Sequence, residues 1–334
     1  MPGVGVDLVT YGWNDTLAEL FAPFAAQGLI PGRIAREHTH IYRVYTADGD
    51  LLARVTGRFR HEARGRQDFP AIGDWVAVRP TERSGDAQIH GVLPRKSKFS
   101  RKIAGATPEE QVVAANVDTI FLVSALDGDF NLRRLERYLA VVRESRARPV
   151  IVLNKTDLCS DVGGAVTAVQ NIAPDIPAHA VSCARDKGLE TLGTHLQPRE
   201  TVALLGSSGV GKSTLINKLL GDERLRIRDV RTKDRRGRHT TTNRELIVMP
   251  GGALMIDTPG MRELQLWESD EGLQETFEDI EALAPDCFFR DCQHLEEPRC
   301  AVKAAVAEGR MSQQHVNSYH KLKTELRQLR KKTE

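Results

Sequence analysis

The sequence predicts a multidomain protein with a small N-terminal β-barrel, a central α/β domain and a cysteine-rich, α-helical C-terminal domain. Three observations lead to this fold class. Short strand-like runs separated by turns fill much of the first hundred residues, strand and helix patterns alternate from about Val112, and three cysteines and a histidine lie close together near the C-terminus. We place an N-terminal extension, the barrel, the α/β domain and the C-terminal domain at 1–35, 36–100, 101–278 and 279–334.

The composition is that of a soluble globular protein. The chain has 334 residues, of which 40% are hydrophobic and 28% are charged, and its formal net charge is +2. No apolar run approaches the length of a membrane span, and the N-terminus lacks the basic start and apolar core of a secretory signal. We therefore expect a cytoplasmic protein with no membrane-bound part, and we expect a monomer.

The N-terminal part is predicted to contain one short helix followed by the barrel. Asn14 or Asp15 is expected to cap an amphipathic helix that ends near Gly28. Two strand-like runs then flank Asp48-Gly49, which is a strong hairpin signal. Further short strands follow without a helical pattern between them, so the sequence favours a small β-barrel with an undetermined number of strands.

The central domain is predicted to be a mostly parallel sheet with helices on both faces. From Val112 onward, five apolar runs each open into a polar loop: VDTIFLVSAL, RPVIVLNKTDL, PAHAVSC, ETVALLGSSG and ALMIDTPG. Ligands of such sheets bind at the carboxyl ends of the strands. The polar loops are therefore expected to meet at one edge of the sheet.

The loop GSSGVGKST fits the phosphate-loop pattern G-x-x-x-x-G-K-[ST]. Its glycines allow backbone N–H groups to face phosphate oxygens, and the helix that starts near Lys212 adds its positive end. Lys212 would reach the β- and γ-phosphates, and Ser213 would bind Mg²⁺. The alternative is a chance Gly/Ser-rich turn. The candidate phosphate-binding residues are Gly206, Ser207, Ser208, Gly209, Val210, Gly211, Lys212, Ser213 and Thr214.

The tetrapeptide Asn154-Lys155-Thr156-Asp157 predicts recognition of guanine. The Asp157 carboxylate can accept hydrogen bonds from guanine N1–H and the 2-amino group, which adenine lacks. The Lys155 stem can lie along the base, and Asn154 can tie this loop to the phosphate loop. Alone, such a tetrapeptide also occurs in surface turns. Ser182 lies where a further loop would touch the guanine edge.

Two further segments predict the groups that sense the γ-phosphate. Asp257 begins the DTPG segment and would hold Mg²⁺, while the Gly260 N–H would meet the γ-phosphate; in isolation, this is also an ordinary Asp-initiated turn. Thr241 or Thr242 would supply a second hydroxyl to Mg²⁺, and spacing does not choose between them. Met261 stands where many GTPases have a glutamine, so we expect slow intrinsic hydrolysis that the target stimulates, with His239 supplying the missing polar contact unless it is a solvated loop residue.

Together these motifs resemble a translation-factor-like GTPase whose order is circularly permuted: base motif, Ser182 loop, phosphate loop, switch threonine, DTPG. With GDWV in the barrel, GRHTT and the Cys/His spacing, the chain closely resembles the RsgA family from about residue 36 to 325. The resemblance implies an OB-fold barrel, GTP hydrolysis with Mg²⁺, a zinc-binding domain and late maturation of the 30S ribosomal subunit. Nothing is transferred to the first 35 residues.

Cys287, Cys292, His294 and Cys300 have the spacing C-x₄-C-x-H-x₅-C, which predicts one structural Zn²⁺. Three thiolates and an imidazole fill a tetrahedral site, so no position stays open for catalysis. The alternative is a group of buried free thiols. Cys159 and Cys183 are expected to be core or loop residues.

Local clusters of positive charge predict contacts with RNA, and the resemblance implies that this RNA is the 16S rRNA. Residues 224–238 carry eight Lys or Arg directly before the switch threonines, and 94–102 adds more beside the barrel. The basic C-terminal helix, roughly 311–332, is either a solvated face or another phosphate contact. We expect GTP loss to move the C-terminal domain and release the subunit. The alternatives are a GTPase acting on another RNA or the large subunit, and an RNA-binding module that only senses nucleotide.

Overall fold

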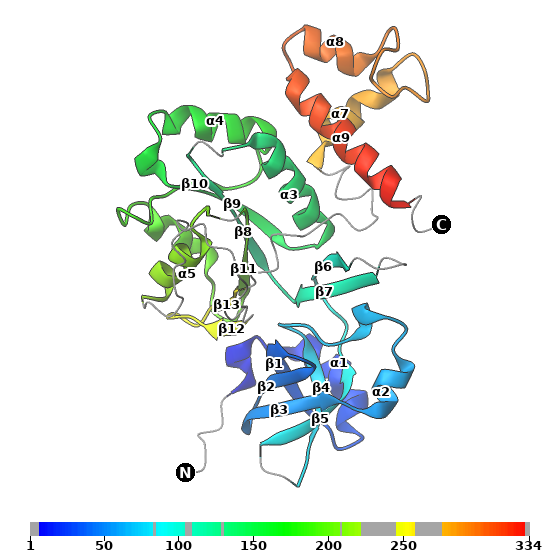
Figure 1. Ribbon diagram of the computed structural model, residues 1–334, viewed down its shortest axis with the longest axis vertical. Coiled ribbons are helices and arrows are strands. Elements are labelled where there is room, and N and C mark those ends of the chain that lie inside the picture. The colour runs from blue at the N-terminus through cyan, green and yellow to red at the C-terminus, as the bar shows by residue number, and fades with distance from the viewer. Residues whose placement is uncertain are drawn as a thin grey trace, which may run out of the picture.

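The computed structural model describes residues 7–82, 85–103, 109–127, 130–207, 209–221, 245–257 and 276–330. Within them, eleven strands form one continuous sheet in the order β10-β9-β8-β11-β13-β12-β1-β2-β3-β5-β4, and β1 also pairs with β4. The strands from β1 to β5 therefore close into a barrel, while the strands from β8 to β13 form the open central sheet (Figure 1). No helix in these ranges is long and apolar enough to span a membrane.

The barrel forms as the turn signals predict. Asn14 caps α1, since its Oδ1 accepts from Leu17 N at 3.0 Å, and Gly49 takes a φ of 113° at the hairpin between β2 and β3. Both local predictions are confirmed. The elements of this part are η1 (Leu8–Tyr11), α1 (Asp15–Ala25), β1 (Ile30–His38), β2 (Ile41–Thr46), β3 (Gly49–Val55), α2 (Gly57–Glu62), η2 (Arg66–Asp68), β4 (Trp75–Pro80) and β5 (Asp86–Val92).

The central sheet has helices on both faces, as the alternating pattern predicts. Along β8, Ile120 and Leu122 belong to the core that α3 and α4 cover, while Phe121 and Val123 belong to the core that α5 covers. The elements are β8 (Thr119–Ala125), α3 (Leu132–Glu144), β9 (Arg148–Asn154), η3 (Thr156–Leu158), α4 (Val162–Ile172), β10 (Ala178–Ala180), η4 (Leu189–His195), β11 (Thr201–Leu205), α5 (Lys212–Leu220), β12 (Glu245–Val248) and β13 (Leu254–Asp257).

Two features lie outside the predicted pattern of the central domain. A separate two-stranded antiparallel ribbon, β6 (Lys98–Ile103) with β7 (Glu109–Ala115), connects the barrel to β8. The strand β12 is antiparallel to β13 and pairs with β1 through Arg36 and Glu245, so it joins the barrel to the central sheet.

The C-terminal domain is α-helical, as predicted, and lies beside α3 (Figure 1). Its elements are α7 (Glu278–Leu283), η6 (Ala284–Asp286), α8 (Ala301–Ala307) and α9 (Gln313–Arg330). The expected boundaries at 35/36, 100/101 and 278/279 differ from these elements, because the first two fall inside β1 and β6, and the third falls after the first residue of α7. Residues 30–35 are thus barrel strand rather than extension.

Candidate functional site

The candidate nucleotide site lies at one edge of the central sheet. Strands β8, β9, β10 and β11 are parallel to their neighbours, so their carboxyl ends point the same way. The base motif continues from β9 at Asn154, and the phosphate loop follows β11 after Leu205. The two motifs stand far apart in the sequence, yet the register places them on nearby strands, separated by β8 alone.

Two glycines allow the phosphate loop to approach its neighbours closely. Gly206 has a φ of 157° and Gly211 a φ of 98°, a backbone region that side chains rarely adopt. A Cβ at Gly206 would collide with the Val123 carbonyl, and one at Gly211 would collide with the Asn154 side chain. Helix α5 then begins at Lys212, and the backbone N–H groups of its first turn have no partner within the helix, so they are available to a bound anion.

The Asn154 side chain joins three loops. It is buried, its Nδ2 donates to the Val210 carbonyl at 2.9 Å, and its Oδ1 accepts from Cys183 N at 3.2 Å. The link between the base motif and the phosphate loop that the sequence predicts is therefore present. One amide thus fixes the base motif, the phosphate loop and the loop of residues 181–183 relative to one another.

The two charged residues of the base motif have defined partners. Lys155, whose φ of 63° lies in the left-handed region, extends its Nζ to Asp127 Oδ2 at 2.8 Å. Asp157 accepts a hydrogen bond from the Ser182 hydroxyl, and this bond is the main reason that its pKa is lowered. Asp157 is therefore ionised at neutral pH and ready to accept hydrogen bonds. Sequence reasoning missed Asp127, although it follows β8 at the same edge.

The phosphate-loop lysine lies against its own loop. Lys212 Nζ donates to the Gly206 and Ser207 carbonyls at 2.5 and 2.6 Å. On the opposite side, the Tyr138 hydroxyl of α3 lies 3.4 Å from Ser207 Oγ. Sequence reasoning missed Tyr138, because nothing in the helical pattern of α3 marks it as a neighbour of this loop.

Several predicted site residues lie outside the described part of the chain. They are Ser208, His239, Thr241, Thr242 and Gly260, together with the basic segment 224–238. The backbone of Asp257 ends β13, parallel to β11, at the edge that carries the other motifs.

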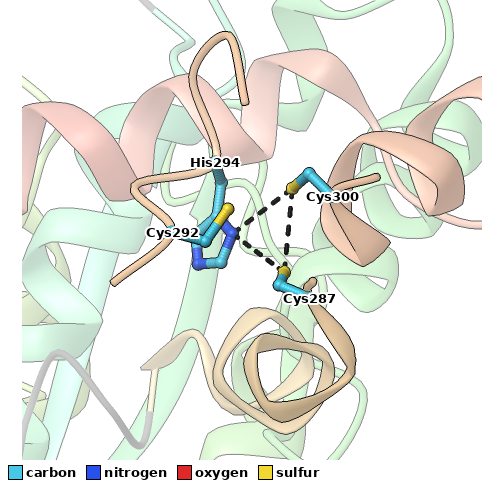
Figure 2. Close-up of side chains that lie close together, drawn as sticks. All are labelled: Cys287, Cys292, His294 and Cys300. Atoms are coloured by element: carbon cyan, nitrogen blue, oxygen red, sulfur yellow. Dashed lines mark hydrogen bonds between the residues drawn. The ribbon is translucent and has the colours of Figure 1, made fainter. Parts of the chain in front are cut away.

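A second candidate site lies in the C-terminal domain, where the four predicted ligands come together (Figure 2). Their donor atoms all lie within 4.8 Å of one another. Cys287 Sγ is 3.8 Å from Cys300 Sγ and 3.5 Å from His294 Nδ1, and Cys300 Sγ is 3.4 Å from the same nitrogen. The four residues, Cys287, Cys292, His294 and Cys300, form a buried group that could hold a metal ion.

Burial disfavours the charged forms of the ligands in the absence of an ion. It raises the pKa of Cys292 to about 11 and, together with Lys323 and His320, lowers the pKa of His294. A bound cation would instead favour the thiolate forms and lower the pKa of the cysteines. Cys159 and Cys183 stand apart from the cluster, and Cys183 is buried in the core, as predicted.

Comparison with known proteins gives consistent matches. Residues 92–267 match the family model described as RsgA GTPase. A protein of Opitutus terrae named small ribosomal subunit biogenesis GTPase RsgA is 50% identical over 95% of this chain and 89% of its own length.

Two solved structures share the fold. The crystal structure of YjeQ from Thermotoga maritima matches with a TM-score of 0.68 at 27% identity, covering 89% of this chain and 98% of that one. YloQ, described as a circularly permuted GTPase, matches with a TM-score of 0.63 at 26% identity, covering 90% and 96%. The central domain therefore has the circularly permuted GTPase fold that the motif order predicts.

Proposed function

Because the chain belongs to the RsgA GTPase family, as its motifs predict, we propose that it hydrolyses GTP as an assembly factor in late maturation of the 30S subunit. In this proposal it binds 16S rRNA, works as a monomer in the cytoplasm and uses GTP hydrolysis to leave the subunit. The main support for GTP binding is the pair of hydrogen bonds that Asn154 makes with Val210 and Cys183. These bonds place the guanine-type motif next to the phosphate loop, as a single nucleotide site requires.

The assignment of roles follows from the chemistry of each group. Asp157 reads the guanine edge, Lys155 supports the base with its stem and Ser182 orients the Asp157 carboxylate. Backbone N–H groups of the phosphate loop hold the phosphates, and Lys212 exchanges its two loop carbonyls for phosphate oxygens. Ser213 and Asp257 would hold Mg²⁺, which would supply charge neutralisation for the phosphates.

Substitution of Asp157 by Asn tests the assignment of the base. Guanine offers two donors to a carboxylate, whereas xanthine has a carbonyl in place of the 2-amino group and accepts from an amide. Asp157→Asn is therefore expected to weaken GDP binding by at least about tenfold and to strengthen binding of xanthosine diphosphate, measured by calorimetry.

The matched control is Asp175→Asn, because Asp175 lies on the exposed loop that follows α4, away from the base motif. It should leave both affinities unchanged. If Asp157→Asn lost affinity for GDP and for xanthosine diphosphate equally, Asp157 would support the fold instead of recognising the base.

For hydrolysis, we propose that Thr241 or Thr242 completes the Mg²⁺ shell, Gly260 N–H meets the γ-phosphate and His239 helps to orient water. His239→Ala should retain GTP affinity and lose subunit-stimulated turnover by about tenfold to a hundredfold. Retention of stimulated turnover would remove His239 from the mechanism.

The metal-binding cluster supports a structural Zn²⁺. Ligand distances of about 2.3 Å to sulfur and about 2.0–2.1 Å to nitrogen separate tetrahedral ligand atoms by about 3.5–3.8 Å. The three separations between Cys287, His294 and Cys300 are 3.8, 3.5 and 3.4 Å, and this agreement for three of the four ligands supports zinc over a chance cluster of thiols; Cys292 lies within 4.8 Å of the others. With four protein donors, the ion would stabilise the fold rather than carry out a reaction.

For RNA binding, we propose that the barrel is an OB-fold that contacts rRNA together with the basic segments 94–102 and 224–238. In the first segment Arg95 is largely buried against Asp74, so the contact would fall to the exposed Lys96 and Lys98, which also pair with Asp118 and Glu110. Co-sedimentation with 30S and 50S particles under GTP, GDP and a non-hydrolysable analogue tests this. Tight binding to 30S only with GTP or the analogue is expected. Tighter binding to 50S than to 30S particles would favour action on the large subunit. Equal binding to 30S particles with GTP and with GDP would contradict the proposed release step.

A further inference from the structure

The surface of the metal-binding loop carries three exposed apolar side chains, Phe288, Phe289 and Leu295, which we call the apolar knuckle. Their exposed fractions are 61%, 40% and 60%. Among the described residues, six large hydrophobic side chains are at least 40% exposed, and three of them lie within the eight consecutive positions 288–295. Exposed apolar residues scattered singly need no explanation, but such a concentration indicates a contact surface.

The apolar knuckle is held in place by the loop that carries the metal ligands. Phe288 N donates to the Arg299 carbonyl at 3.2 Å, and Cys292 N donates to the Phe289 carbonyl at 3.2 Å. The two phenylalanine rings pack edge to face at 5.0 Å, and the Arg299 guanidinium lies 5.0 Å above the Phe288 ring. These side chains are therefore ordered before any partner arrives, which lowers the entropic cost of binding.

The segment that carries the apolar knuckle contains more acidic than basic residues, and its nearest printed cations are Arg299 over Phe288 and Lys303, which donates to the Glu297 carbonyl at 3.5 Å. Residues 278–300 contain two arginines and no lysine. Glu297 lies directly beside Leu295, because its carboxylate accepts from Leu295 N at 2.8 Å and from Gln293 N at 2.9 Å; the Gln293 bond is the largest contribution to its lowered pKa. The acidic residues of this segment are Glu278, Asp279, Glu281, Asp286, Asp291, Glu296 and Glu297. Two of them, Asp279 and Glu281, are hydrogen-bonded to His315 and Tyr319 of α9, so the remaining five supply the acidic charge near the knuckle.

This charge balance distinguishes between two kinds of partner. A surface that binds RNA neutralises phosphates with Lys and Arg, so an acidic surround repels it. Protein contacts instead combine an apolar centre with a rim of complementary charge. An apolar centre with an acidic rim therefore matches a basic protein surface.

We propose that the apolar knuckle docks on a basic protein of the small ribosomal subunit rather than on its RNA. This inference rests on the proposed function and names a partner class for the C-terminal domain. The barrel and the basic segments then serve RNA binding, while the metal-binding loop serves protein binding. The metal-binding loop thus provides a rigid scaffold for Phe288 and Phe289.

Photo-cross-linking identifies the partner directly. Full-length Phe288→p-benzoylphenylalanine protein is mixed with purified small subunits and a non-hydrolysable GTP analogue, illuminated and pelleted. The expected product is a covalent adduct with a basic protein, identified by mass spectrometry. An adduct with RNA, or no adduct in a complex that sediments, overturns the inference and leaves the proposed function intact. Failure of the unmodified protein to sediment with subunits overturns both.

A substitution measures how much the surface contributes. The double change Phe288→Ser with Phe289→Ser is expected to weaken binding to the subunit by about tenfold or more. Leu20→Ser is the matched control, because Leu20 is an exposed leucine (40%) on α1 of the other end of the chain. Metal content and thermal unfolding must match the unmodified protein. Unchanged affinity of the double variant contradicts the inference.

Discussion

The two junctions of the molecule are built differently. The junction between the barrel and the GTPase domain is part of a continuous sheet, because β1 pairs with both barrel strands and β12. The junction between the GTPase and C-terminal domains is a contact of α3 with α9 around a buried ionic group. The difference indicates that the barrel is fixed to the nucleotide-binding domain, while the C-terminal domain is separable.

The first junction depends on a buried arginine. Arg33 of β1 is 2% exposed and donates from Nη2 to the Thr201 hydroxyl of β11 at 2.7 Å and from Nε to the Gly73 carbonyl at 3.3 Å. It also donates to the Tyr11 carbonyl. Burial lowers its pKa to about 10, so it remains charged at neutral pH. One side chain therefore joins η1, the barrel and the central sheet.

The GDWV motif explains the rest of this junction. Gly73 has a φ of 87° and lies so close to the Ala115 carbonyl that a Cβ would collide with it. The next residue, Asp74, is fully buried and accepts two hydrogen bonds from Arg95 at 2.8 and 2.7 Å. The motif therefore has a structural role at the junction.

The second junction is centred on His315 of α9. Its Nδ1 lies 2.5 Å from Glu136 Oε1 of α3, and its Nε2 lies 3.1 Å from Asp279 Oδ1 of α7. Burial acts to lower the pKa of His315, but hydrogen bonds and charge from Asp279 and Glu136 outweigh it and raise the pKa to about 9. The imidazolium donates on both sides and links the GTPase domain to the C-terminal domain.

The largest expected effect comes from removal of the metal ion that we propose for the Cys/His cluster. Chelation, or Cys292→Ser, should strip amide protection from residues 276–330 and leave the barrel–GTPase unit folded, since a structural ion stabilises the domain that it organises. Hydrogen exchange with metal analysis measures this. Cys159→Ser is the control and should keep the metal, because Cys159 lies outside the cluster. Unfolding of the whole chain would contradict the separation of the two parts.

The next effect is that of breaking the buried ion pair of Asp74 with Arg95, which lies in the barrel beside the first junction. Asp74→Ala leaves Arg95 without its carboxylate and should lower the free energy of unfolding by about 3–5 kcal/mol in urea titrations. Asp50→Ala is the control, because its ion pair with Arg43 is exposed and should contribute less than about 1 kcal/mol. Equal losses in both variants would refute the structural role of the GDWV motif.

A smaller and local effect is expected at the second junction. His315→Gln retains a polar group but loses the charge between Glu136 and Asp279, so opening of the C-terminal domain should become easier by about 2 kcal/mol. Faster exchange confined to α3 and the C-terminal domain is the expected result. Arg310→Gln, which breaks only an exposed pair with Glu308, should have no such effect. Faster hydrogen exchange in the barrel would contradict a local role of His315.

The smallest effect is a dependence on pH at the same junction. The folded pKa of His315 is raised from 6.5 to about 9, so its stabilising contribution is complete below pH 6.5 and is lost as pH rises toward 9. Limited proteolysis of the C-terminal domain should therefore accelerate over this interval. His315→Gln should abolish that acceleration, and a variant that retains it would assign the dependence to another group.

Local features of the fold could be predicted from sequence because neighbouring residues determine them. Asn14 and Asn131 cap their helices with their own side chains, and Gly49 sets the hairpin. The ribbon β6–β7 could not be predicted, because its first strand resembles a basic loop and the ion pair of Lys98 with Glu110 forms only when the two strands meet. Pairing of β12 with β1 depends on a contact between residues distant in sequence.

The same distinction between local sequence signals and long-range contacts applies to the candidate sites. Asn154, Asp157 and the four candidate metal ligands stand in short motifs whose spacing reflects the chemistry predicted for them. Tyr138 and the contact of Glu136 with His315 carry no local signal, since each depends on how two distant helices or loops pack. Sequence therefore identifies the chemical groups, while the tertiary structure shows which of them are connected.

The central claim is that the barrel and GTPase domain form one unit and that the C-terminal domain responds separately to nucleotide. Hydrogen exchange of the full-length, metal-loaded protein, compared with a non-hydrolysable GTP analogue and with GDP, tests it most directly. The account predicts that protection changes in α7 and α9 and stays constant in β1 to β5. A change in barrel protection equal to that of the C-terminal domain, or no change in either helix, would contradict it.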